Sequence, residues 1–136
     1  PLLVVTMWFV MRSNSQLREY YGQAFYGGLH SDKAVHRHLL MIYVSLLLLM
    51  PWEFLWRGFF LFGVARVTGP GPAILFQAIP FALLHIGKPE IETITTVFSG
   101  IGFGFVAWRT QSFLYPLLIH VSLLLPTNLL ASGAFG

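Results

Sequence analysis

The sequence predicts an all-α protein, built as a multi-pass transmembrane helical bundle. Hydrophobic residues make up 56% of the 136 residues and charged residues only 10%, and the mean hydropathy is +0.71. In a soluble domain, about a quarter of the residues are usually charged. Several apolar runs also approach the roughly 20 residues that a helix needs to cross the bilayer core. We therefore expect an integral, multi-pass membrane protein, and we take a bacterial or archaeal plasma membrane as its location without a signal in the composition.

The amino-terminal third precedes the long apolar runs. The opening run, PLLVVTMWFVM, is too short to cross a bilayer, and no Met starts the chain, so we expect the chain to be part of a longer protein. Residues 12–38 hold several charged and aromatic side chains. We expect this segment to be an extramembrane or interfacial loop, with one interfacial helix around QLREYYGQAFYG.

Longer apolar runs follow in order, and each is expected to be a span. They cover residues 39–65, 73–87, 93–108 and 113–131. The run at 73–87 is short for a full crossing, so we expect it to be buried in the bundle or to end within a cavity. The breaks between the runs contain glycine, proline or small polar groups and are short, which favours antiparallel neighbours. We expect a single membrane-embedded domain over 1–136.

The charged residues restrict the partners and the topology. The net charge is +3, but the eight basic residues are scattered singly, which disfavours nucleic acid as a partner and favours the lipid bilayer. The 12–38 segment and Lys88 place more basic residues on one side than Arg66 and Arg109 place on the other, so the first side is expected to be cytoplasmic. No cysteine occurs, which excludes disulfides and thiolate ligands.

Only four ionisable residues lie within the predicted spans: Glu53, Arg57, His85 and His120. An ionisable group in the membrane costs about 2.5 to 3.5 kcal/mol, so such groups usually face the bundle interior and mark a functional site. These four residues are the candidate site.

Glu53 and Arg57 are four residues apart, so a helix places them on one face as a favourable acid-to-base pair. One interpretation is a structural ion pair. The other is that Arg57 holds Glu53 ionised, so that the carboxylate can take a proton from water or bind a metal. The spacing leaves both open.

The two histidines add further chemistry. His85 closes the run AIPFALLH and could cap a helix, whereas His120 lies among apolar residues. Two histidines and one carboxylate can bind zinc or another divalent metal with an open water position, or activate water directly. The sequence leaves metal dependence unknown. Glu90 and Glu92 are expected to be solvated loop acids, with a reserve of carboxylates as the alternative.

Two other motifs are interpreted as structural or surface features. Gly100 and Gly104 form a G-x-x-x-G pattern that allows two helices to approach closely. His30, His36 and His38 cluster in the basic segment, and we interpret them as surface residues.

In combination, the motifs resemble the CPBP family of intramembrane proteases, which contains the CAAX prenyl endopeptidases and the bacterial Abi-type membrane proteins. The family pattern is E-E-x-x-x-R, then F-x-x-x-H, then a third histidine helix that often carries Asn four residues later. This chain has W-E-F-L-W-R-G at 52–58, F-A-L-L-H at 81–85 and a glycine-containing helix, a short turn and a histidine helix over 98–120. The resemblance covers residues 39–125.

The resemblance implies an intramembrane endopeptidase that hydrolyses a membrane-proximal bond of a peptide or protein substrate. Glu53, oriented by Arg57, would polarise a water molecule together with His85. His120 would stabilise the oxyanion or complete a metal site.

The chain departs from the family pattern at two positions. Trp52 stands where the family has its first glutamate, and Leu124 stands where it often has Asn, with Asn128 one turn further along. Glu53, Glu90 or Glu92 could serve as the base instead. Alternatively, the chain is a catalytically silent member that acts as a membrane binding or immunity-type protein. A proton-coupled carrier ranks last, because the broken-helix repeats of many carriers are missing.

Overall fold

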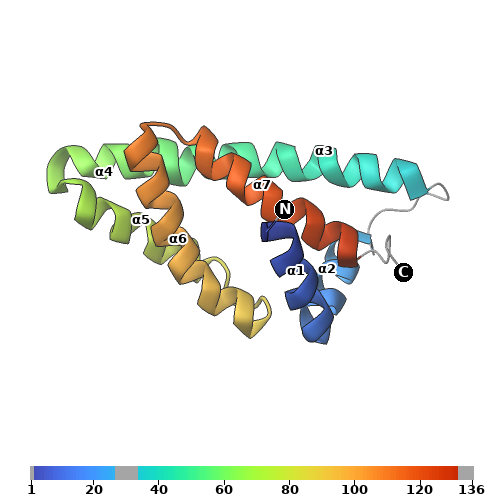
Figure 1. Ribbon diagram of the computed structural model, residues 1–136. Helices are drawn as coiled ribbons and strands as arrows, with labels where there is room; N and C mark the ends of the chain where they lie inside the picture. The colour runs from blue at the N-terminus through green and yellow to red at the C-terminus, as the bar shows by residue number, and fades with distance from the viewer. Residues whose placement is uncertain (1, 27–33, 132–136) are drawn as a thin grey trace. The chain divides into compact units, whose positions relative to one another are not determined.

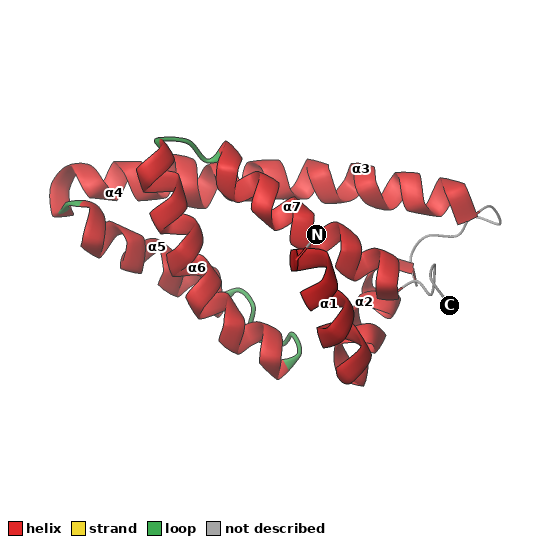
Figure 2. Ribbon diagram, viewed as in Figure 1, coloured by secondary structure: helices red, strands yellow, loops and turns green. Residues whose placement is uncertain are grey.

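The computed structural model describes residues 2–26 and 34–131, and every named element in them is helical (Figures 1 and 2). The elements are α1 (Leu2–Ser13), α2 (Ser15–Tyr26), α3 (Ala34–Glu53), the π-helix η1 (Phe54–Phe60), α4 (Leu61–Thr68), α5 (Pro70–Leu83), α6 (Glu90–Thr110) and α7 (Leu114–Ala131). The predicted all-α fold class is confirmed.

Three helical segments are long and apolar enough to cross a membrane. Within residues 2–26 and 34–131 they are Leu39–Thr68, Glu90–Thr110 and Leu114–Ala131. α5 is apolar but has only 14 residues, so it falls below the length of a full span. The second predicted span, 73–87, therefore corresponds to the short helix α5.

The beginning of the first long helix differs from the prediction. We placed residues 34–38 in a loop, but α3 already begins at Ala34. The stretch AVHRH contains no glycine or proline to stop a helix, so the helix can extend beyond the apolar run. The interfacial helix expected around QLREYYGQAFYG corresponds to α2.

The described chain falls into two compact units. The terminal unit comprises Pro1–Leu48 and Ile119–Gly136, and the central unit comprises Leu49–Leu118. In the terminal unit, Met11, Leu17 and Tyr21 are buried together, and Leu124 packs against them.

In the central unit, glycine and proline define the helix ends. Gly69 ends α4 with a φ of +81°, and Pro70 is the first residue of α5. Gly87, with a φ of +98°, lies in the link to α6, and Pro89 precedes that helix. Glycine adopts positive φ without steric cost, and proline fits the first position of a helix. The predicted breaks are thus the helix boundaries.

α5 packs against α4 and α6 within the central unit (Figure 1). A Cβ atom added to Gly100 would lie 3.2 Å from the Cβ of Ala78 and 3.2 Å from a ring carbon of Phe81. Any larger residue would therefore force Ala78 or Phe81 to shift by a few tenths of an ångström, and glycine lets α5 and α6 approach closely. The predicted role of the G-x-x-x-G pattern fits this contact.

A π-helix interrupts the long helical segment. Over Phe54–Phe60 the backbone pairing widens, and the N–H of Leu61 donates to the carbonyl of Trp56, five residues earlier. Short π-helical segments are rare and frequently occur at functional sites. This one contains Arg57.

Burial in the central unit is inverted relative to a soluble protein. Large apolar side chains such as Phe59 and Phe98 are exposed, whereas Glu53, Arg57 and Gln77 are fully buried. Such an arrangement suits lipid outside and polar groups inside.

Candidate active site

Glu53 and Arg57 form a buried ion pair in the central unit. Arg57 Nη1 donates a hydrogen bond to Glu53 Oε1 at 3.2 Å, and both side chains are 0% exposed. Glu53 ends α3 and Arg57 lies in η1. The predicted pairing of these two residues is therefore present in the structure. A buried pair of this kind must stay intact, because either charge alone would be left uncompensated.

Two aromatic rings cover the guanidinium group of Arg57. Its Cζ lies 3.9 Å from the ring centroid of Phe81 and 5.2 Å from that of Phe103. Arg57 Nε and Nη2 are buried, and neither has a hydrogen-bond acceptor among residues 2–26 and 34–131. The ring faces supply electrostatic attraction to the cation at this position. α5 and α6 each contribute one ring, so Arg57 joins η1 to both helices.

His85 lies on the other side of Phe81. The ring centroids of Phe81 and His85 are 4.8 Å apart, and His85 Nδ1 lies 2.8 Å from the carbonyl oxygen of Phe81. A carbonyl oxygen can only accept, so Nδ1 carries a hydrogen, and in a neutral ring Nε2 then carries the lone pair. The side chain is buried. Thr93 Oγ1 also donates to the His85 carbonyl at 2.9 Å.

Trp52 packs directly beside this histidine. Its ring centroid lies 6.3 Å from that of His85 and 6.0 Å from that of Phe81. The indole is half-buried. An aromatic ring thus stands next to His85 at the chain position where the related motif has a carboxylate.

Gln77 is a buried polar residue that the sequence analysis missed. Its Nε2 donates to the carbonyl of Gly100 at 2.7 Å and to that of Ile74 at 2.9 Å. The candidate site predicted from the sequence contained only ionisable residues, so the neutral amide within AILFQAIPFALLH was not included. A polar residue in an apolar run was the available signal, since such groups usually face the bundle interior.

Glu90 and Glu92, the two acids after His85, were predicted to lie in a loop, and this prediction is wrong. α6 begins at Glu90, and both Glu90 and Glu92 belong to its first turn, where negative charge is favoured. Glu90 is exposed. Glu92 accepts a hydrogen bond from Lys88 Nζ at 2.7 Å, so this acid takes part in a local ion pair.

The histidine of the third motif, His120, falls in the terminal unit. His120 is half-buried on α7, and its convergence with Glu53 and His85 stays a prediction. Leu124 packs in the apolar cluster of this unit. Asn128 is 0% exposed, and its amide has no hydrogen-bond partner among the residues that the structure describes.

The remaining histidines are His30, His36 and His38. His36 is exposed on α3, whereas His30 and the side chain of His38 lie outside the described residues. Across residues 2–26 and 34–131, no three His, Asp or Glu side chains gather as a metal site would require. Zinc or another divalent metal stays a prediction.

The helices and the buried acid, base and histidine place the chain in a class: integral membrane proteins with a polar intramembrane site. A family model described as Type II CAAX prenyl endopeptidase Rce1-like matches residues 34–124. The chain therefore belongs to the Rce1-like family, which confirms the resemblance to the CAAX proteases. Neither the curated proteins nor the solved structures gave a match.

Proposed function

We propose that this protein is an intramembrane endopeptidase that hydrolyses a membrane-proximal peptide bond, with Glu53, His85 and His120 at its active site and Arg57 as a positioning residue. Membership in a family of CAAX-type proteases supports the reaction class. The observation that carries the proposal is the position of Phe81, whose ring contacts both the guanidinium of Arg57 and the imidazole of His85. Phe81 thereby links the buried ion pair to the histidine, which supports placing them in one site.

The tautomer of His85 suits a general base. With Nδ1–H donating to the Phe81 carbonyl at 2.8 Å, Nε2 can accept a proton from water. The resulting hydroxide equivalent attacks the carbonyl carbon of the substrate, and the C–N bond then breaks as His85 Nε2 returns the proton to the departing amine. Glu53, oriented by Arg57, would help to polarise the water, and His120 would donate to the oxyanion.

A matched pair of substitutions at His85 tests this proposal. Asparagine can replace Nδ1 as the donor to Phe81 but has no equivalent of Nε2, so His85→Asn should keep the anchoring hydrogen bond and remove the base. We expect a loss of about 10²- to 10⁴-fold in the cleavage rate. The assay would follow hydrolysis of a prenylated peptide with a CAAX terminus by the protein in liposomes.

The control measures whether the variant is still folded. Thermal unfolding in detergent should show His85→Asn close to the wild type, whereas His85→Ala, which also loses the hydrogen bond to Phe81, should be less stable. Cleavage by His85→Asn at the wild-type rate would refute the assignment of His85 as base.

The second candidate function is a catalytically silent membrane protein of binding or immunity type. Trp52 favours this candidate, because its ring lies 6.3 Å from that of His85 at the position of the family's first glutamate. In that case the wild type should cleave no peptide, and Trp52→Glu should create activity. If the wild type cleaves and Trp52→Glu adds nothing, the silent candidate fails.

A further inference from the structure

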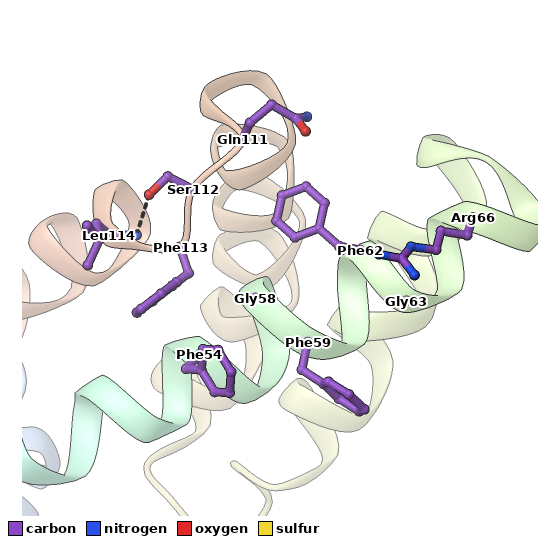
Figure 3. Close-up of a pocket in the computed structure, with 10 residues that line it drawn as sticks. All are labelled: Phe54, Gly58, Phe59, Phe62, Gly63, Arg66, Gln111, Ser112, Phe113 and Leu114. Carbon is purple, nitrogen blue, oxygen red and sulfur yellow. Dashed lines mark hydrogen bonds between the residues drawn. The ribbon is translucent and has the colours of Figure 1, made fainter.

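A pocket of about 490 Å³ lies in the central unit where the link between α6 and α7 passes α4 (Figure 3). Phenylalanine side chains form much of its lining: Phe54, Phe59, Phe62 and Phe113. Figure 3 shows Phe113 pointing from the link toward the helix that carries Phe54, and these two rings meet edge to face with centroids 5.5 Å apart. Such a lining suits a flexible hydrocarbon chain.

One of the two glycines in this pocket leaves open space beside the backbone. Gly58 and Gly63 both line it, but a Cβ atom added to Gly58 would lie 3.1 Å from the ring of Phe54, so protein already fills the space there. A Cβ atom added to Gly63 would meet no atom within 4 Å, so the space beside this residue is empty of protein. A hydrocarbon chain can therefore lie against the helix backbone at this point.

One end of the pocket is basic. Arg66 lines it and is exposed, and among residues 2–26 and 34–131 no acidic side chain forms an ion pair with it. The chain has no Asp or Glu between residues 54 and 89. Arg66 also lines a second pocket of about 410 Å³, together with Phe62, Trp108 and Gln111. The positive charge thus lies where the two pockets share residues.

Polar groups of the link lie at this end as well. The side-chain amide of Gln111 donates to the Trp108 carbonyl at 2.6 Å, and the backbone of Gln111 has a φ of +52°. Ser112 Oγ accepts from the N–H of Leu114 at 3.2 Å, which leaves the Ser112 hydroxyl hydrogen able to donate to an anion.

The depth of the pocket fits a lipid. Arg66 is close to the end of the candidate span Leu39–Thr68, and Gln111 directly follows the span Glu90–Thr110. Trp108 and Phe62, whose ring centroids are 5.9 Å apart, lie at the same end. Aromatic residues gather where membrane meets water, so Arg66 lies near the level of the lipid headgroups.

We propose that this pocket, the Arg66 groove, binds one anionic phospholipid. An acyl chain lies along the phenylalanine rings past Gly63, and the phosphate group pairs with the guanidinium of Arg66. The cation has no acidic partner in the described protein, and arginine is well suited to bind a phosphate group. This inference is independent of peptide hydrolysis.

The test is lipid binding by the purified protein in mild detergent, measured by native mass spectrometry. The probes are phosphatidylglycerol and phosphatidylcholine with identical acyl chains. We expect tighter binding of phosphatidylglycerol, and Arg66→Gln should lower that affinity by about fivefold. Arg109→Gln is the matched control, because Arg109 is also exposed at the end of its helix but lines neither pocket.

A second pair of variants tests the acyl-chain part of the groove. Gly63→Leu should fill the groove without a clash and reduce binding of both lipids. Gly102→Leu is its control, since a Cβ atom at Gly102 also meets nothing within 4 Å but Gly102 lies outside the groove.

Three results would overturn the proposal. The first is equal binding of both lipids by the wild type, and the second is an equal effect of Arg66→Gln and Arg109→Gln. The third is displacement of the bound lipid by a farnesylated peptide without phosphate that binds equally well to Arg66→Gln, because the groove would then hold the prenyl chain of a substrate.

Discussion

Arg57 and Arg66 lie nine residues apart in the chain and have opposite surroundings. Arg57 is 0% exposed, bonded to Glu53 and covered by two phenylalanine rings. Arg66 is exposed at the end of an open groove, with no acidic partner among the described residues. A cation inside the bundle needs its counter-charge from the protein, whereas a cation at the membrane edge can take it from a ligand. At the Glu53–Arg57 pair both charges belong to the protein. In the Arg66 groove the negative charge can come from a bound ligand.

The largest effect should come from breaking the buried pair. Glu53→Gln leaves the charge of Arg57 buried without a carboxylate, so we expect a loss of about 3 to 5 kcal/mol in the free energy of unfolding. Chemical unfolding in detergent micelles would measure it. The double variant Glu53→Gln with Arg57→Met should be more stable than Glu53→Gln alone, and additive losses would contradict the pairing.

A smaller effect should follow from crowding the helix interface near the buried pair. A Cβ atom at Gly104 would lie 2.5 Å from Gln77 Nε2 and 3.2 Å from a methyl carbon of Ile74. Gly104→Ala should therefore destabilise the protein by about 1 to 3 kcal/mol. Gly102→Ala, on an open face of the same helix, should not. Equal melting temperatures for the two variants would refute the close packing.

The smallest effect on stability should come from the groove. Arg66→Gln should change the free energy of unfolding by no more than about 0.5 kcal/mol in lipid-free detergent, because this side chain is exposed and has no partner there to lose. Added phosphatidylglycerol should raise the melting temperature of the wild type more than that of the variant. A large loss of stability without lipid would mean that Arg66 supports the fold instead.

Much of the fold could be predicted from the sequence, because membrane helices are specified by local features. The apolar runs predicted the helices, and Gly69, Pro70 and Pro89 predicted where they end. The start of α3 was misplaced, since a helix can continue into polar residues when nothing stops it.

The candidate site was predicted only in part. The spacing of Glu53 and Arg57 predicted their hydrogen bond, but it could not predict that Phe81 and Phe103 cover the guanidinium, because that contact depends on how α5 and α6 pack. The π-helix at Phe54–Phe60 has no clear sequence signal. The contact between Trp52 and His85 likewise needs the tertiary structure.

The short length of α5 bears on how the chain enters the membrane during synthesis. Its 14 residues extend about 21 Å at 1.5 Å per residue, against a hydrocarbon core about 30 Å thick. It also carries Gln77, whose amide donates to the carbonyl of Gly100 on the next helix and to that of Ile74 on its own. We therefore expect α5 to wait at the translocon until α6 has been translated. The two helices would then partition into lipid as a hairpin, so that the ribosome completes α6 before α5 leaves the channel.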